Sequence, residues 1–167
     1  MIGPSDLDHV ASEPFDRTLC REMERWFVEE YIPTWVEAGT AASADLRSIL
    51  DYWGVPLHVS NPNGNQWLTT PREVVEMLEA IQKPLKARGY SHTVIIDRRS
   101  TYYNERAISV DVIWSRRGEN EREIERRAVH FEIRNLEGEY RIISIAACHT
   151  PESRLAAVFS YDRSDEE

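Results

Sequence analysis

The sequence predicts a single α+β domain, in which a curved antiparallel sheet from the second half of the chain is covered on one face by helices from the first half. In residues 107–115, apolar side chains alternate with small or polar ones, which is the period-two pattern of a strand. Residues 128–135 and 141–149 repeat this alternation. From about residue 15 the apolar spacing changes to three and four, the period of a helix. A chain of 167 residues with 41% hydrophobic content is long enough for one core.

The first helical segment runs from about Phe15 and carries a wide apolar stripe. Pro33 lies inside this segment and should kink it or split it into two helices. A second, short helix is expected from about Asp45, with Gly54 as its C-terminal stop. The stripe of the first segment consists of Leu19, Met23, Trp26, Phe27, Tyr31 and Trp35.

Strong turn signals separate a short first strand, residues 54–60, from the next helix. Residues 61–65 read Asn-Pro-Asn-Gly-Asn, and a small strand can follow them before Thr70. The hydroxyl of Thr70 can cap a helix, and Glu73 stands three residues later, where its carboxylate can reach back to the cap. We therefore predict that a third helix begins at Thr70.

The long strands also predict a register. A hairpin loop over residues 116–120 places Val112 opposite Val129 and Val110 opposite Phe131. The resulting face is almost purely apolar and should meet the helices. Burying it stabilises the fold by roughly 1.5–3 kcal/mol per large side chain.

The other face of the sheet combines charged and apolar residues, which suits a subunit interface better than open water or a core. We predict a homodimer through this face, unless the C-terminal tail, residues 151–167, covers it instead. The mixed face is expected to contain Asp111, His130, Glu132, Arg134, Ile113, Ile143, Ile145 and Ala147.

Charge argues against nucleic acid as a partner. The net charge of −9 repels phosphate backbones. The basic pairs Arg98-Arg99, Arg116-Arg117 and Arg126-Arg127 stand at strand ends among acidic residues, and we interpret them as a solvated rim.

Other features narrow the class of protein further. Cys20 and Cys148 have no metal-ligand spacing, and neither a Gly-rich phosphate loop nor an HExxH motif is present, so we expect no metal or other cofactor. The first residues lack the basic start and apolar run of a signal peptide, and we see no membrane-spanning stretch. We expect a cytoplasmic protein.

Three parts of the sequence together resemble the NTF2-like superfamily, which includes SnoaL-like polyketide cyclases, ketosteroid isomerase and scytalone dehydratase. They are the passage from Asp51 to Val59, the capped helix at Thr70, and the hairpin at residues 138–142. The resemblance implies a cone-shaped fold over residues 14–150, with a pocket at the open end and frequent dimerisation through the outer sheet face. Residues 1–13 are polar and acidic, and we expect them to form a loose arm.

The resemblance also suggests catalytic residues for a cofactor-free acid–base enzyme of the cyclase or dehydratase type. Tyr31 lies where the isomerase and the dehydratase place tyrosines that polarise a carbonyl, although it can equally be a core residue with its hydroxyl at the rim. Asp51 and His58 are placed at the pocket mouth, and either could serve as the base. Asn61 stands where the isomerase has its carboxylate base, and an amide can bind but not abstract a proton.

The most direct functional expectation is the binding of a small, largely apolar molecule. The competing hypothesis is a non-catalytic dimerisation or protein-binding module, in which side chains fill the pocket. Asp111 and His130 form either a carboxylate–imidazole dyad or an ordinary surface pair. The residues expected to bind the ligand are Trp35, Tyr52, Trp53, Asn61, Trp67 and Trp114.

Overall fold

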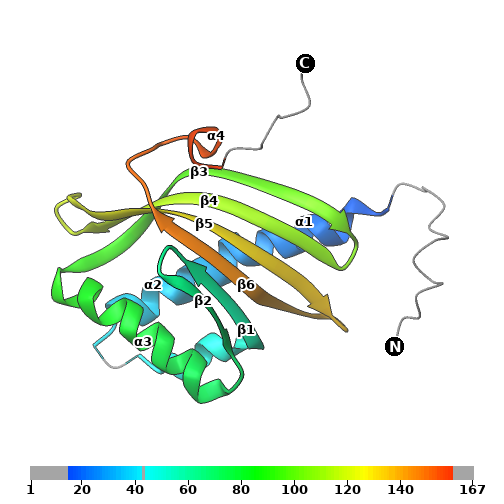
Figure 1. Cartoon of the computed structure of the whole chain (residues 1–167), viewed down its shortest axis with the longest axis horizontal. Coiled ribbons are helices and arrows are strands. Elements are labelled where there is room, and N and C mark those ends of the chain that lie inside the picture. Colours follow the sequence, from blue (N-terminus) through cyan, green and yellow to red (C-terminus); the bar gives the residue numbers. More distant parts are fainter. Residues whose placement is uncertain (1–14, 43, 160–167) are drawn as a thin grey trace.

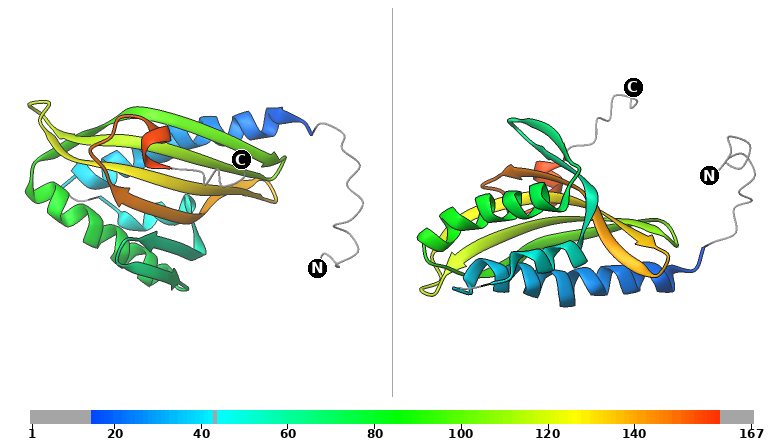
Figure 2. Two further views of the ribbon diagram at one scale, coloured as in Figure 1. Left: turned by 45° about the horizontal axis from the view of Figure 1, so that its top comes forward. Right: turned by 90° about the horizontal axis from the view of Figure 1, so that it is seen from below.

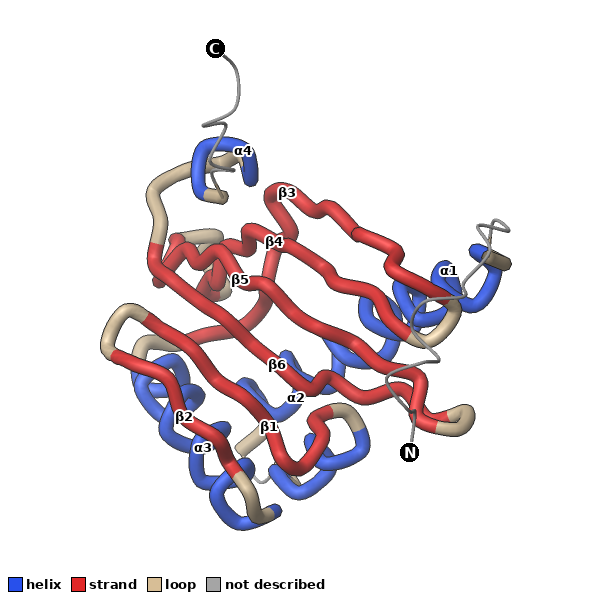
Figure 3. The backbone as a smooth tube through the Cα atoms, turned by 45° about the vertical axis from the view of Figure 1, so that its right-hand side comes forward, coloured by secondary structure: helices blue, strands red, loops and turns tan. Residues whose placement is uncertain are grey.

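The computed structural model describes residues 15–42 and 44–159 (Figure 1). The predicted arm at residues 1–13 and the acidic end of the tail lie outside the described residues. One mixed sheet has the strand order β2-β1-β6-β5-β4-β3, which can be followed in Figure 3. Its strands are β1 (Trp53–Asn61), β2 (Gly64–Leu68), β3 (Tyr90–Asn104), β4 (Ala107–Gly118), β5 (Glu123–Leu136) and β6 (Glu139–His149).

Helices from the first half of the chain cover one face of this sheet, as predicted (Figure 2). A continuous helical segment consists of α1 (Arg17–Trp26), the π-helical turn η2 (Phe27–Tyr31) and α2 (Ile32–Thr40). The segment therefore stays helical throughout, and Pro33 lies in the first turn of α2, directly after the π-helical turn, where its missing N–H is tolerated.

The π-helical turn keeps the apolar stripe aimed at the sheet. Met23, Phe27, Tyr31 and Trp35 are all buried, and each stands four residues after the last. In a helix of 3.6 residues per turn, each step of four rotates the stripe by ~40°. The wider turn at Phe27–Tyr31 brings the stripe back into line.

Two further helices, next to α2 and β1, complete the helical layer. The expected short helix is the 3₁₀ helix η3 (Leu46–Asp51), capped by the Asp45 side chain. The helix α3 (Pro71–Ala87) begins after Thr70 with the predicted capping box. Thr70 Oγ1 accepts from the Glu73 N–H at 3.3 Å, and Glu73 Oε2 accepts from the Thr70 N–H at 2.9 Å. The side of α3 that packs into the core carries Val74, Leu78 and Leu85.

The register predicted for the two central strands is confirmed. Val112 pairs with Val129, Val110 with Phe131, and Asp111 with His130. The apolar face belongs to the main core together with the helices. β1 pairs with β2 through a tight turn and runs parallel to β6 on its other side.

The prediction that Ile145 and Ala147 lie on the outer face is wrong. They pair with Phe131 and Val129, whose side chains face the helices. Between Glu132 and Ile133 the register of β6 shifts, and Ile143 is the extra residue of this bulge. A bulge interrupts the period-two alternation, so side chains beyond it change face. Ile143 stays on the outer face, while Ile142 and Ile145 both point inward.

The tail covers one end of the outer face. The short helix α4 (Leu155–Val158) lies opposite α1 and α2 across the sheet (Figure 2). Leu155 packs against Ile113 and Ala128, and its backbone N–H donates to Asp97 Oδ2 at 2.8 Å. Within the described ranges, none of the helices has the length and apolar composition needed to cross a bilayer.

Candidate functional site

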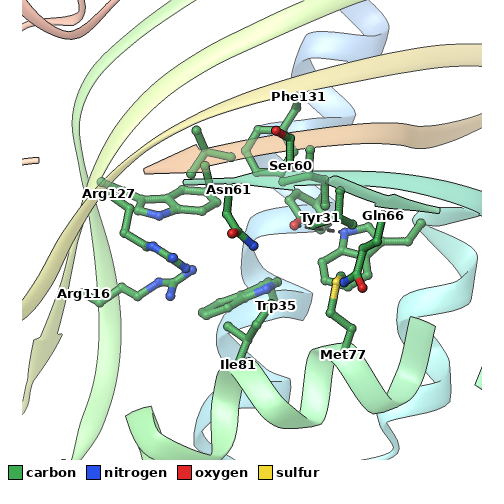
Figure 4. Close-up of a pocket in the computed structure, with 16 residues that line it drawn as sticks. Tyr31, Trp35, Ser60, Asn61, Gln66, Met77, Ile81, Arg116, Arg127 and Phe131 are labelled. Atoms are coloured by element: carbon green, nitrogen blue, oxygen red, sulfur yellow. Dashed lines mark hydrogen bonds between the residues drawn. The ribbon is translucent and has the colours of Figure 1, made fainter. Parts of the chain in front are cut away.

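A cavity of about 150 Å³ lies between the inner face of the sheet and the helices α2 and α3 (Figure 4). Pockets for drug-sized ligands measure about 300–1,000 Å³, so this space suits a molecule of roughly one ring. The side chains come from every layer of the fold. The lining residues are Tyr31, Trp35, Trp53, Val59, Ser60, Asn61, Gln66, Met77, Ile81, Trp114, Arg116, Arg127, Val129, Phe131, Ile145 and Ala147.

The inner end of the cavity contains one oriented hydroxyl. Tyr31 is 1% exposed, and its oxygen accepts a hydrogen bond from Trp53 Nε1–H at 3.1 Å. Burial raises the pKa of Tyr31 well above its ordinary value, since no water is available to solvate a phenolate. The hydroxyl therefore stays protonated and can donate to an oxygen atom of a bound molecule.

The opposite end of the cavity carries two arginines. Arg116 on β4 is 4% exposed, forms an ion pair with Glu125, and stacks 4.2 Å above the ring of Trp35. Burial lowers the pKa of Arg116, and Glu125 opposes this effect. Arg127 on β5 lies directly opposite Trp114, and its charge also disfavours the charged form of Arg116. Figure 4 shows both guanidinium groups turned toward Asn61 at this end.

Three N–H donors at this end have no hydrogen-bond partner among the described residues. They are Nε of Arg116, Nε of Arg127 and Nε1 of Trp114, and all three atoms are buried. An unpaired buried donor costs roughly 1–3 kcal/mol, so native proteins satisfy nearly all of them. A site that leaves three together is complementary to an acceptor that arrives from outside.

The interpretation of these arginines as a solvated rim is wrong for Arg116 and Arg127. Strand alternation places Arg116 on the same face as Trp114, and Arg127 on the same face as Val129. Arg117 and Arg126, their neighbours in the sequence, instead bond to Glu121 and Glu123 outside the cavity. Extending the period-two pattern by one step in each strand would have placed both arginines on the inner face of the sheet, although not at a particular depth.

The structure brings five of the residues predicted for the site into this one cavity. Besides Tyr31 and Trp53 at the inner end, these are Trp35, Asn61 and Trp114. Tyr52, which was also predicted to bind the ligand, lies outside it. Its ring stacks on Trp26 at 5.5 Å between centroids, and its hydroxyl accepts from Thr34 Oγ1 at 3.2 Å.

The predicted acid–base residues do not converge. Leu57, Val59 and Asn61 point inward along β1, so alternation turns His58 to the outer face. There its Nδ1 lies 3.2 Å from Ser144 Oγ, and its ring packs against Trp67 with centroids 4.9 Å apart. Trp67, the remaining predicted ligand-binding residue, is 63% exposed and therefore also lies outside the cavity.

Asp51 is likewise separate from the cavity. It is the last residue of η3, its side chain is exposed, and it is absent from the cavity lining. Among the described residues that line the cavity, none is a carboxylate or an imidazole. In residues 15–42 and 44–159, no group of three or more His, Cys, Asp or Glu side chains is arranged to hold a metal ion.

The outer face carries the Asp111–His130 pair. His130 Nδ1 lies 2.6 Å from Asp111 Oδ1, and Arg99 donates to Asp111 Oδ2 at 2.8 Å. The hydrogen bond to Asp111 raises the pKa of His130. Burial alone would raise the pKa of Asp111, but the hydrogen bonds from His130 and Arg99 outweigh it and lower that pKa. This pair lies across the sheet from the cavity.

Comparison with known families gives one match for most of the chain. A family model described as NTF2-like protein (DUF6841) matches residues 21–150. Curated proteins offer no match to the sequence.

Solved structures share the fold at low sequence identity. Aln2 from a Streptomyces species has a TM-score of 0.61 and 9% identity, covering 81% of this chain and 94% of that chain. An NTF2-like protein with a cystatin-like fold from Novosphingobium aromaticivorans has a TM-score of 0.59 and 14% identity, covering 84% and 89%. A putative calcium/calmodulin dependent protein kinase II association domain from Xanthomonas campestris has a TM-score of 0.55 and 15% identity, covering 79% of this chain and 88% of that chain. The cone-shaped α+β fold is therefore shared, and at these identities the likeness extends to the fold alone.

Proposed function

This chain belongs to the NTF2-like family whose model spans residues 21–150, and on that premise we propose that it binds a small, largely apolar molecule in the cavity between helices and sheet. The observation that carries the proposal is the aromatic wall of the cavity. Tyr31, Trp35, Trp53, Trp114 and Phe131 surround a space large enough for one ring. Such side chains give a ligand extensive apolar contact without loss of many rotamers.

The competing hypothesis of a non-catalytic module requires that side chains fill this space. The cavity stays open and is reached by the Tyr31 hydroxyl, which supports ligand binding over that hypothesis. For an acid–base reaction, Tyr31 would remain the group that polarises a carbonyl oxygen. His58 and Asp51 would have to act from outside the cavity, so we propose binding as the primary activity.

The experiment pairs two substitutions at neighbouring residues of β6. Ala147 lines the cavity, whereas Ala146 precedes it in the strand and pairs with His130, whose side chain is on the outer face. Ala147→Leu should fill the cavity, and Ala146→Leu adds the same volume outside it. Ligand-observed NMR with a panel of single-ring compounds should show saturable binding to wild type and Ala146→Leu, and loss of binding in Ala147→Leu.

Circular dichroism must show that both variants remain folded. Saturable binding that persists in a folded Ala147→Leu variant would place the ligand elsewhere. The absence of saturable binding to wild type across the panel would contradict the proposal outright.

We also propose that the outer face binds a second copy of this chain. Helix α4 covers the end of that face at Ile113, but Ile143 and Trp67 line an open groove farther along it. Leu136, which also lines this groove, is 51% exposed. The groove therefore combines apolar side chains with the charged Glu132, and this composition is expected of an interface between subunits.

A further inference from the structure

The end of the cavity that contains the arginines is incomplete in hydrogen bonding and in charge. Glu125 neutralises Arg116 through their ion pair. For the Arg127 side chain, by contrast, no hydrogen bond or ion pair is found within the described part of the chain, although it lies close enough to Arg116 to lower the pKa of that group. One positive charge is therefore left over at this end, beside three unsatisfied donors.

The three donors come together on the inner face of the sheet. Trp114 and Arg127 are directly opposite each other in the β4–β5 register, and Arg116 follows Trp114 by two residues on the same face. In Figure 4 the two guanidinium groups lie side by side, with the amide of Asn61 near them. A guanidinium presents its N–H groups in a planar fork, which a planar carboxylate can accept with both oxygens.

Charge and volume select among anions. A single excess positive charge is balanced by a monoanion, whereas a phosphate dianion would leave a negative charge in a largely apolar site. The rest of the cavity is lined mainly by apolar and aromatic side chains such as Ile145, Phe131 and Trp53, with Gln66 and the Tyr31 hydroxyl among its polar groups, and it is about one ring in size. A compact carboxylic acid with a ring or short branched chain meets both conditions.

We propose that the ligand of this cavity is a small carboxylate, held by Arg127, Arg116 and Trp114 with its apolar body directed toward Tyr31 and Trp53. This inference rests on the proposed binding function and names its ligand class. It also explains why two like charges are kept together in a partly buried site. The arriving carboxylate satisfies the donors and offsets the repulsion between the guanidinium groups.

The test compares benzoate with benzamide, which has the same ring and nearly the same shape but no charge. Wild type should bind benzoate at least about tenfold more tightly by isothermal titration, because a hydrogen bond to a charged group is the stronger kind. Arg127→Gln should abolish this preference. Arg126→Gln is the matched control, since it removes the same charge from the adjacent residue, which pairs with Glu123 outside the cavity, and should keep the preference.

A second readout separates ligand binding from a structural role. If Arg127 serves the ligand, removing its charge relieves the repulsion on Arg116, so unliganded Arg127→Gln should melt no lower than wild type. If Arg127 only packs against the cavity and supports the fold, the variant should have a lower melting temperature than wild type and retain the preference for benzoate. This inference would then be wrong. The comparison of benzoate with benzamide on wild type holds even if the variant fails to fold.

The outcomes also distinguish the two proposals. Equal affinity of wild type for benzoate and benzamide would overturn the carboxylate inference and leave the binding function standing. Inorganic phosphate that binds more tightly than benzoate would likewise overturn it. If wild type binds neither ring compound nor any other member of the single-ring panel, the binding function itself fails, and this inference fails with it.

Discussion

His130 and Asp111 show how one hydrogen bond ties the protonation of a side chain to the stability of the fold. They face each other on β5 and β4, with Arg99 on β3 and Glu132 on β5 beside them. Because the carboxylate of Asp111 accepts from His130 and from Arg99, the protonated imidazole is the form that the folded protein favours. The pKa of His130 is therefore higher in the folded state than in the unfolded state.

We expect the contribution of His130 to stability to depend on pH in a defined direction. A raised folded-state pKa gives stabilisation that is complete below the ordinary histidine value of 6.5 and is lost as the pH rises through the folded-state pKa. In urea unfolding, the difference between wild type and His130→Gln should therefore be largest below pH 6.5 and shrink as the solution becomes alkaline.

Asp111→Asn provides the control for this prediction. Without the carboxylate, the His130→Gln substitution should no longer change the pH dependence between neutral and alkaline solution. A difference between wild type and His130→Gln that grows with rising pH would contradict the assignment.

At the scale of elements, the start of α3 depends on two side chains that satisfy each other's backbone. Thr70 caps the first turn, and the Glu73 carboxylate accepts hydrogen bonds from the N–H groups of Thr69 and Thr70. These hydrogen bonds lower the pKa of Glu73. Because α3 supplies Met77 and Ile81 to the cavity, its cap also helps to hold one wall of the site.

Thr70→Ala should lower the free energy of unfolding by about 0.5–2 kcal/mol, because a capping hydroxyl is lost. Thr70→Ser keeps the hydroxyl and is the matched control, which should remain close to wild type. Chemical denaturation measures both. Equal stabilities of the two variants would show that the cap does not depend on this side chain.

At the scale of the whole molecule, the two faces of the sheet differ in what packs against them. The inner face packs on the helices and lines the cavity, while α4 covers only part of the outer face. Among the described residues, the part that α4 does not cover carries Ile143 in the groove next to His58 and Trp67. The proposed homodimer would bury this groove around a two-fold axis.

Ile143→Asp should split the proposed dimer while each subunit stays folded, because an unpaired charge in a buried interface is strongly unfavourable. Light scattering gives the mass, and circular dichroism checks the fold. Ile95→Asp is a suitable control, since Ile95 is 37% exposed and pairs with Trp114, on the other side of the sheet. A wild-type mass of one chain at high micromolar concentration would contradict the dimer proposal.

The sequence by itself determined the features that depend on local periods and local hydrogen bonds. The alternation in residues 107–115 and 128–135 was enough to predict both strands and their register, because slipping by one residue would turn the apolar set away from the helices. The cap at Thr70 needed only a hydroxyl and a carboxylate three residues apart. Tyr31, Trp35 and Trp114 could be predicted for the cavity because large aromatic residues on core-facing stripes pack between the helices and the sheet, where the cavity lies.

Only the tertiary structure decided how distant segments meet. The bulge at Ile143 changes the face of Ile145, and it arises from the pairing of β6 with β5 and β1 rather than from any local signal. His58 faces away from Tyr31 because the packing of β1 against η3 and α3 decides which of its two alternating faces is the inner one. Arg127 became a site residue because β4 and α3 enclose that end of β5. The burial of a charged side chain depends on which elements pack around it, and sequence composition alone does not show how deeply it is buried.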